Sequence, residues 1–266
     1  MFKTDNKKII CGILNITPDS FSDGGLYLEK KEASKRACEM VEQGASWIDI
    51  GGQSTRPFSN PVDSRTEKER VIPVIKELKK ILPSNIVMSI DTYYPDVAEE
   101  AIQNGADIVN DVTGLRNKEM INIIVKYRKP VVIMHMKGDQ KTMQQNPCYD
   151  NVIKEINDFF ISKIKELSKY NFDDIILDPG IGFGKNLEHN LTILKNLSSF
   201  KKLGFPIMIG PSRKSFIGMI TGEKLPSKRV SGTIAACLYS YSYADIFRVH
   251  DVYEINQAFA VWKTLC

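Results

Sequence analysis

Four polar residues stand at or just after the ends of short apolar runs: Asp91, Asn110, Asp178 and Lys214. Their carboxylate, amide and ammonium groups supply adjacent acceptors and donors, which can pair with the amidine-like edge of a heterocycle such as a pterin or purine. Three further residues could contact an anion: Arg56, Arg248 and His250. A single Asp or Asn at such a position more often caps a turn or helix, but four buried polar groups need partners or a ligand. The residues therefore predict a site for a planar heterocycle with an anionic appendage.

Eight apolar runs precede the polar signatures and predict the strands that position them. The runs are 9–14, 47–50, 87–90, 108–109, 131–134, 175–177, 207–209 and 246–247. Continuous apolar runs are typical of parallel strands buried on both faces. The stretches between them place apolar residues at intervals of three and four, which predicts helices. These helices cover 31–42, 67–81, 95–103, 117–126, 151–168, 187–197, 229–243 and 252–265.

Alternation of eight strands with helices predicts an α/β fold, a (β/α)8 TIM barrel, in one domain over residues 1–266. The active site of such a barrel lies at the carboxyl ends of its strands, so the eight signatures should converge there. Three segments, after the first, second and fifth strands, are too long for tight turns: 17–30, 53–66 and 135–150. We expect all three to lie over the catalytic rim, the first two as lids.

Composition and charge argue against several classes of protein. The chain is 42% hydrophobic and 26% charged, as in ordinary globular proteins rather than disordered ones. Lys and Arg exceed Asp and Glu by 36 to 32, without a basic block, so we expect no nucleic-acid partner. The polar first residues and the lack of a long apolar stretch predict no membrane association and a cytoplasmic location.

Other sequence features favour neither a dinucleotide site nor a metal centre built from side chains alone. Residues 180–184 read Gly-Ile-Gly-Phe-Gly, which lacks the GxGxxG spacing of a dinucleotide fingerprint. Three histidines without an H-E-x-x-H pattern argue against a zinc enzyme. The five cysteines are scattered, odd in number and never paired as C-x-x-C, so we expect no disulfide framework. Lys214 could form a Schiff base in principle, but its polar neighbours favour an anion-compatible loop.

Eight sequence blocks occur in order along the chain. They are Leu-Asn-Ile-Thr-Pro-Asp-Ser-Phe-Ser-Asp-Gly-Gly at 14–25, Asp-Ile-Gly-Gly-Gln-Ser-Thr-Arg-Pro at 49–57, Ser-Ile-Asp-Thr at 89–92, Asn-Asp-Val at 110–112, Met-His-Met at 134–136, Asp-Pro-Gly-Ile-Gly-Phe-Gly-Lys at 178–185, Ser-Arg-Lys-Ser at 212–215 and Arg-Val-His-Asp at 248–251. Together they resemble the dihydropteroate synthase family over essentially the whole chain. Each block alone is weak, but eight in the right order are specific.

This resemblance implies a transferase of folate biosynthesis that condenses 6-hydroxymethyl-7,8-dihydropterin diphosphate with para-aminobenzoate to 7,8-dihydropteroate and diphosphate. It implies a pterin site formed by Asp91, Asn110, Asp178 and Lys214, of which Asp91, Asp178 and Lys214 are the expected catalytic residues. It places diphosphate against Asn15, Ser215, Arg248 and His250, with Asn15 also helping to hold Mg²⁺. It places para-aminobenzoate against Thr55, Arg56, Pro57, Phe183, Ser212 and Lys214. Sulfonamides are then expected inhibitors, and a homodimer through the helices at 229–243 and 252–265 is the expected assembly.

The chain departs from the family pattern at three places. Gln53 replaces the usual Glu of the second block, and Phe58 follows Pro57 where Gly is frequent. Gln140 and Asn151 stand where Pro and Asp are common. Two alternatives stay open at this point: a pterin-binding protein without synthase activity, and a methyltetrahydrofolate-dependent methyltransferase on a similar barrel. The presence of Asn15, Arg56, Arg248 and His250 and of the first and last blocks favours the synthase.

Overall fold

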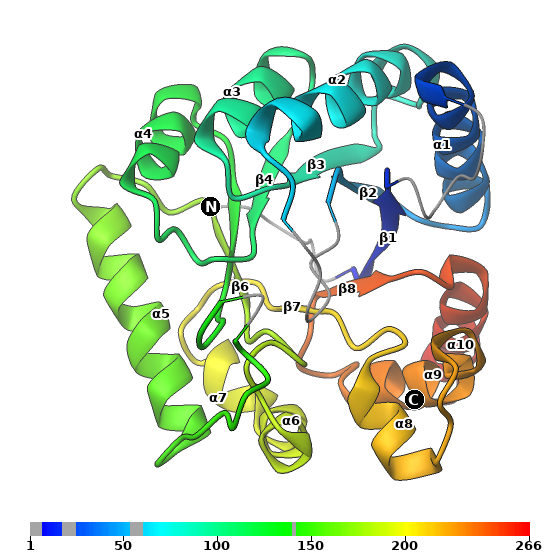
Figure 1. The fold of residues 1–266 in the computed structure, drawn as a ribbon. Helices are drawn as coiled ribbons and strands as arrows, with labels where there is room; N and C mark the ends of the chain where they lie inside the picture. Colours follow the sequence, from blue (N-terminus) through cyan, green and yellow to red (C-terminus); the bar gives the residue numbers. More distant parts are fainter. Residues whose placement is uncertain (1–6, 18–24, 54–60, 140–141) are drawn as a thin grey trace.

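The computed structural model describes residues 7–17, 25–53, 61–139 and 142–266, with residues 25–29 described as backbone only. In this part of the chain, strands alternate with helices around a single sheet (Figure 1). The strands are β1 (Ile9–Asn15), β2 (Trp47–Gly51), β3 (Val87–Asp91), β4 (Ile108–Asp111), β5 (Val131–Met134), β6 (Ile175–Asp178), β7 (Met208–Ile209) and β8 (Ile246–Val249). The helices are α1 (Gly25–Glu42), α2 (Ser64–Ile81), α3 (Pro95–Gln103), α4 (Lys118–Tyr127), α5 (Val152–Ser168), α6 (Leu187–Lys195), α7 (Leu197–Lys201), α8 (Ser215–Thr221), α9 (Val230–Tyr239) and α10 (Val252–Leu265), with the 3-10 turn η2 (Pro226–Lys228).

The sheet closes on itself. All seven strand pairings are parallel, in the order β6-β5-β4-β3-β2-β1-β8-β7. The two remaining edges meet through a parallel bridge between Leu177 and Ile207, and the Leu177 amide donates to the Pro206 carbonyl at 2.9 Å. Closure leaves no long free edge, and the helices form an outer ring (Figure 1). The predicted (β/α)8 barrel is therefore confirmed.

Side chains that point into the barrel form an apolar layer near the amino ends of the strands. This layer contains Cys11, Trp47, Ile108, Val132, Ile176, Met208 and Ile246, packed against Ile9 and Val87. Since side chains alternate along a strand, the next inward positions lie two residues further on, toward the carboxyl ends. Those positions carry the polar residues of the site. Outward side chains pack against the helices in a separate, larger core that includes Ile48, Ile90, Val71 and Phe160.

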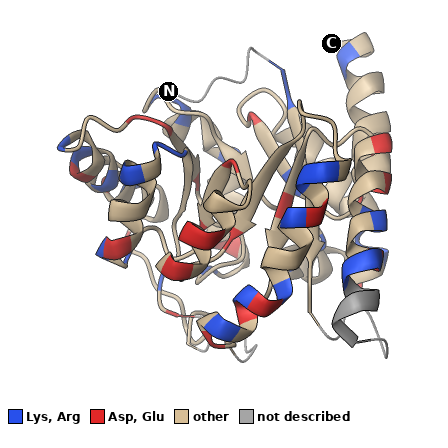
Figure 2. Ribbon diagram, turned by 90° about the horizontal axis from the view of Figure 1, so that it is seen from above, with Lys and Arg blue, Asp and Glu red and all other residues tan. Residues whose placement is uncertain are grey.

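Many of the charged residues lie along the helices (Figure 2). Lys, Arg, Asp and Glu are spread over them without a patch of one sign in the view of Figure 2. Several helices begin where a polar side chain caps them: Asp63 accepts from the Thr66 amide at 2.7 Å, and Asn186 and His189 form a reciprocal capping box. Among the described residues, no helix is both long and apolar enough to cross a bilayer.

Two predicted boundaries were wrong, and one helix was not predicted. Helix α1 begins at Gly25, so the segment predicted as a loop over 17–30 is helical in its second half, where Leu, Glu and Lys favour a helix. The helix predicted over 187–197 ends at Lys195, and a separate short helix starts at Leu197. Helix α8 was not predicted, because its seven residues are too few to show a helical period and include Gly218.

Candidate active site

The inward positions at the carboxyl ends of the strands carry a polar layer. From β2, β3, β4, β6 and β8 come, in order, Asp49, Ser89 and Asp91, Asn110, Asp178, and Arg248. All are buried except Arg248, whose side chain keeps 17% of its surface exposed. Parallel strands bring their carboxyl ends to the same rim of a barrel, so residues far apart in the sequence meet here. The structure thus joins the predicted residues Asp91, Asn110, Asp178 and Arg248 in one site.

Arg248 lies between two carboxylates. Its Nε donates to Asp49 Oδ2 at 2.6 Å, and its Nη2 donates to Asp91 Oδ2 at 2.7 Å. Burial alone would lower the pKa of Arg248, but the negative charges of Asp49 and Asp91 outweigh it and raise the pKa above its ordinary value. A guanidinium held by two carboxylates is fixed in position. Arg248, predicted from the sequence to contact diphosphate, is thus bonded to Asp91, which was predicted to contact the pterin.

Asp49 was not assigned a role by the sequence, yet it is the most completely bonded acid of the site. Its Oδ1 accepts from Ser89 Oγ, which in turn accepts from Trp47 Nε1 at 2.6 Å. Its Oδ2 accepts from Asn110 Nδ2 at 3.1 Å as well as from Arg248. The signal that could have found it is the alternation along β2, because Asp49 lies two residues beyond Trp47 on the inward side.

Asp91 has one bonded oxygen and one that lacks a partner. Oδ2 accepts from Arg248, whereas Oδ1 is buried and has no hydrogen-bond partner in the part of the chain that the structure describes. Burial raises the pKa of Asp91 to about 7, with Arg248 opposing and Asp49 adding to the rise. An unpaired buried acceptor is costly and calls for a donor. A ligand with N–H groups on its edge would supply that donor.

Asp178 and Lys214 approach the same space from β6 and from the residue before α8. Asp178 Oδ1 accepts from the Gly180 amide at 2.7 Å, and burial raises the pKa of this carboxyl group. Lys214 caps α8 in extended backbone geometry, and its Nζ lies 4.0 Å from the centre of the Phe183 ring. An inner cavity is bordered by Asn110, Asp178, Phe183, Lys214 and Arg248 among others. Three of the four residues predicted to bind pterin thus line one cavity, whereas Asp91 is bonded to Arg248, which lines it.

A larger cavity of about 350 Å³ opens above the inner one. Its wall includes all the residues predicted to contact diphosphate, together with three predicted for the arylamine: Asn15, Ser215, Arg248, His250, Phe183, Ser212 and Lys214. His250 Nδ1 lies 3.0 Å from Ser212 Oγ, and the same hydroxyl accepts from the His250 amide at 3.2 Å. The two cavities share Phe183, Gly210, Lys214 and Arg248. The geometry therefore suits a ligand with a flat buried end and a polar outer end.

Arg213 also borders the outer cavity, but its charge is directed to the protein. The guanidinium makes a two-point ion pair with the carboxylate of Asp251, with Nε donating to Oδ2 at 3.0 Å. Its amide donates to Thr233 Oγ1 at 3.0 Å, and its carbonyl accepts from Arg229 Nη1 at 3.1 Å. Arg213 is thereby held in the left-handed region at φ +57°. The pair fixes the loop between β7 and α8, which carries Ser212 and Lys214.

Part of the predicted site lies outside the described residues. Thr55, Arg56 and Pro57, predicted for the arylamine, belong to that part, as do Phe58 and Gln140. Gln53 is described: its Nε2 donates to Glu67 Oε2 at 3.1 Å and its Oε1 accepts from Tyr93 Oη at 3.1 Å. Glu67 is buried, and desolvation raises its pKa to about 8. An amide at position 53 thus sits beside a buried carboxyl group without adding a second charge.

Across residues 7–17, 25–53, 61–139 and 142–266, no group of three His, Cys, Asp or Glu side chains could hold a metal ion. An ion with fewer protein ligands is a different case, because Mg²⁺ commonly keeps several waters and binds substrate phosphates with one or two protein oxygens. Asn15 ends β1 and borders the outer cavity. Its amide oxygen is a hard ligand of the kind Mg²⁺ prefers, so Asn15 fits the predicted role.

Comparison with known proteins places this site in a family. A family model described as pterin binding enzyme matches residues 11–250. The dihydropteroate synthase of Synechocystis sp. is 44% identical, with 99% of this chain and 93% of that protein covered. The Escherichia coli K12 dihydropteroate synthase is 41% identical over 95% of this chain and 89% of that protein.

Solved structures agree with these sequence comparisons. The dihydropteroate synthase of Clostridium difficile, crystallised in the presence of pteroic acid, has a TM-score of 0.92 and 46% identity, and the match covers 100% of this chain and 99% of that one. The Xanthomonas albilineans enzyme in complex with 7,8-dihydropteroate has a TM-score of 0.89 and 36% identity, covering 99% and 95%. The chain therefore belongs to the dihydropteroate synthase family of pterin binding enzymes.

Proposed function

We propose that this chain condenses 6-hydroxymethyl-7,8-dihydropterin diphosphate with para-aminobenzoate, forming 7,8-dihydropteroate and diphosphate in folate biosynthesis. The observation that carries the proposal is the buried Oδ1 of Asp91, which has no partner among the described residues, together with an inner cavity bordered by Asn110, Asp178 and Arg248, the residue that binds the other Asp91 oxygen. The N–H groups of a pterin edge satisfy such acceptors, and the Asn110 side chain offers both a donor and an acceptor. Family membership and the ligands of the related structures support the same assignment.

The pterin lies in the inner cavity, against Asp91, Asn110, Asp178 and Lys214. Its donors reach the carboxylates of Asp91 and Asp178, and Lys214 offers an ammonium group to its acceptors. Asp49 does not contact the pterin, since its oxygens are already bonded to Ser89, Asn110 and Arg248. It holds Arg248, and through Arg248 it orients Asp91.

The diphosphate lies in the outer cavity, where Asn15, Ser215, Arg248 and His250 supply its contacts. Mg²⁺, held by Asn15 and the diphosphate oxygens, supplies charge neutralisation when bound. The bond between the pterin methylene carbon and the diphosphate oxygen breaks, and both electrons leave with diphosphate. Arg248 and His250 stabilise the charge on the leaving group, while the carboxylate of Asp91 stabilises the cationic pterin.

Para-aminobenzoate binds at the rim, against Phe183, Ser212 and Lys214, with Thr55, Arg56 and Pro57 as its further predicted contacts. Its amine nitrogen donates a lone pair to the methylene carbon, and the proton released from nitrogen leaves with diphosphate or water. No strong base is required, because the electrophile is a cation. The Yersinia pestis dihydropteroate synthase has been solved with a sulfonamide drug, which supports sulfonamides as inhibitors of this chain.

The assembly and location complete the proposal. Large side chains on α9 and α10 are exposed: Tyr239, Tyr253, Val261 and Leu265, at 58%, 52%, 60% and 78%. Clustered exposed apolar groups favour association, so these helices form the interface of a homodimer. All five cysteines are free, which fits a reducing cytoplasm. Sedimentation equilibrium of the wild type and of Val261→Lys tests the interface, since the charge should shift the dimer toward monomer.

Diphosphate release tests the proposed activity. The purified chain is given dihydropterin diphosphate and Mg²⁺, with and without para-aminobenzoate, and diphosphate and dihydropteroate are both measured. We expect equal amounts of the two products, and release that depends on para-aminobenzoate. Binding of the pterin without product would contradict synthase activity and leave a pterin-binding protein. Chelation of Mg²⁺ should slow release while pterin without diphosphate still binds.

A further inference from the structure

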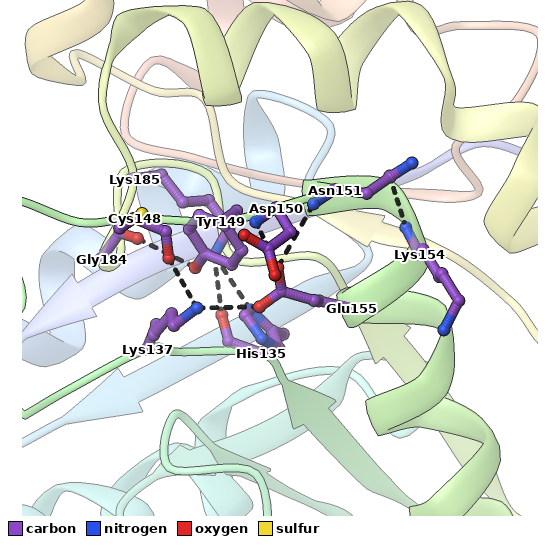
Figure 3. A network of polar contacts seen from close by, with 10 residues as sticks. All are labelled: His135, Lys137, Cys148, Tyr149, Asp150, Asn151, Lys154, Glu155, Gly184 and Lys185. Atoms are coloured by element: carbon purple, nitrogen blue, oxygen red, sulfur yellow. Dashed lines mark hydrogen bonds and ion pairs between the residues drawn. The ribbon is translucent and has the colours of Figure 1, made fainter.

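His135 follows β5, and the sequence gave it no role beyond marking a strand end. In the structure it meets Lys185, a lysine with only 2% of its surface exposed. Lys185 Nζ lies 3.2 Å from His135 Nδ1 and donates to the His135 carbonyl at 3.1 Å (Figure 3). It also donates to the Phe183 carbonyl at 2.9 Å. An ammonium group has three donors, and here it has three acceptors. Lys185 therefore ties the segment after β5 to the segment after β6.

The two segments touch along their backbones. A Cβ atom at Gly180 would lie 2.0 Å from the His135 carbonyl oxygen, and one at Gly184 would lie 2.2 Å from that of Lys137. Both glycines have positive φ, at +68° and +64°, so the close approach and the turn both require glycine here. Tyr149 Oη adds a third link, because it donates to the Gly184 carbonyl at 2.9 Å (Figure 3). The loop over 179–186 is thus held against 135–149 at several points.

Burial and neighbouring charges shift the pKa values of both Lys185 and His135. Burial lowers the pKa of Lys185 to about 7, while the carboxylate of Asp178 favours the charged form and Lys214 opposes it. Burial, with the positive charge of Lys185, lowers the pKa of His135 to about 2, so the imidazole is neutral and its Nδ1 can accept. Lys185 Nζ and its three acceptors, His135 Nδ1 and the carbonyl groups of His135 and Phe183, form a rigid contact between the two loops, which we call the joint.

The side chain that this joint places is Phe183. Its ring borders both cavities and carries Lys214 Nζ 4.0 Å from its centre. It packs with apolar residues of the same rim: Val112, Met134, Met136 and Met143. Lys185 itself borders neither cavity, so a substrate in either one does not reach it. Its bond to the Phe183 carbonyl is a direct connection between the buried joint and the wall of the arylamine site.

We propose that Lys185 is a positioning residue for the arylamine half of the reaction, acting through the Phe183 carbonyl and the neutral His135 ring to set the place of the Phe183 ring beside Lys214. The inference rests on the proposed function for the identity of the arylamine. It requires that loss of these Lys185 contacts change the KM for para-aminobenzoate far more than the KM for dihydropterin diphosphate. A residue that only stabilised the fold would alter both substrates alike or neither.

The test uses Lys185→Met, which keeps a long apolar stem and removes all three donors. We expect the KM for para-aminobenzoate to rise about tenfold, with the KM for dihydropterin diphosphate and kcat each within about threefold, because displacement of a positioning group by a fraction of an ångström is costly. Lys195→Met is the matched control, since Lys195 is an exposed lysine on α6. It should leave every constant at the wild-type value.

Two substitutions at His135 test the joint from the other side. His135→Phe keeps the edge contact with the Phe159 ring, 5.1 Å between centroids, and removes the Nδ1 acceptor. His135→Asn removes the ring but keeps an acceptor near the same place. We expect His135→Phe to reproduce part of the Lys185→Met defect and His135→Asn to restore para-aminobenzoate use. If Lys185→Met does not fold, this pair decides the proposal.

Amide hydrogen exchange provides a readout that needs no activity. In the protein without ligands, the backbone amides of residues 180–186 should exchange at least about tenfold faster in Lys185→Met than in the wild type. Their exchange rates in Lys195→Met should equal those of the wild type. If the wild type had no synthase activity and Lys185→Met still exchanged faster, the proposed function would be wrong but the structural role of Lys185 in holding the two loops together would stand. Unchanged exchange, equal increases in both KM values, or a loss confined to kcat would each overturn the positioning role of Lys185.

Discussion

Asp91→Asn tests the central contact of the site, because it changes charge and donor capacity with almost no change in shape. In the wild type, Asp91 Oδ2 accepts from Arg248 at 2.7 Å and Oδ1 is buried without a partner. The asparagine can still accept from Arg248 through its single oxygen. Its amide group then occupies the place of Oδ1, where it presents N–H donors to a pterin edge that also presents donors.

The expected loss follows from the bond removed. A charge-assisted hydrogen bond in a site closed to water contributes about 2–4 kcal/mol, so kcat/KM for the pterin substrate should fall about 30- to 1000-fold. The free energy of unfolding, in contrast, should not fall in Asp91→Asn. Because burial raises the folded-state pKa of Asp91 from 3.8 to about 7, this group's contribution to stability is full at acid pH and is lost as pH rises through about 7. At pH 8 the uncharged variant should therefore be at least as stable as the wild type.

The assay pairs steady-state kinetics at pH 8 with urea denaturation of the same preparations. Asp111→Asn is the control, since Asp111 is an equally buried strand-end acid whose oxygens are bonded within the chain. Its Oδ1 accepts from the Thr113 amide at 2.7 Å and its Oδ2 accepts from the Leu115 amide at 3.1 Å. The control should lose about 1 kcal/mol of stability and keep its activity within about threefold. Near-normal turnover of folded Asp91→Asn, or a stability loss larger than that of the control, would refute this reasoning.

Three further substitutions or titrations extend the test. Arg248→Met leaves the Asp49 and Asp91 carboxylates uncompensated, so urea denaturation should show a loss of about 3–5 kcal/mol in the free energy of unfolding at pH 8. The loss should shrink at pH 5, where the raised folded-state pKa of Asp91 favours its protonation. His250→Ala should weaken binding of the dihydropterin diphosphate about tenfold in calorimetry and leave the affinity for the dihydropterin without diphosphate unchanged. Equal losses of affinity for both ligands would contradict the role of His250 in binding the diphosphate. Lys185 should give a lysine Cε NMR resonance that titrates near pH 7 and is missing in Lys185→Met. Because the folded-state pKa of Lys185 is lowered from 10.5 to about 7, the contribution of Lys185 to the free energy of unfolding should increase as pH rises from about 7 to about 10.5.

The sequence predicted the barrel because its strands repeat one pattern, an apolar run followed by a polar signature, and the parallel topology then brings those ends together. Asp91, Asn110 and Asp178 were found in this way. Asp49 was missed because it lies inside an apolar run, where an acid is unfavourable unless paired. Its partner Arg248 is on β8, which is separated from β2 by β1 in the sheet and by 199 residues in the chain. The two residues come together because β1 pairs with both β2 and β8, so the pattern of either strand alone does not reveal the pair.

The degree to which each acid is already bonded separates structural carboxylates from those available to a ligand. Asp111 and Asp49 have protein donors on both oxygens, which fixes them as parts of a turn and of the Arg248 support. Asp91 has a donor on one oxygen and none on the other. Since an unsatisfied buried acceptor costs free energy in the empty site, a ligand that satisfies it recovers that cost on binding. The same polar layer is therefore fully bonded around Arg248 and Asp49 and unsatisfied at Asp91 Oδ1, and this difference supports Asp91, rather than Asp49 or Asp111, as the proposed acceptor for the pterin.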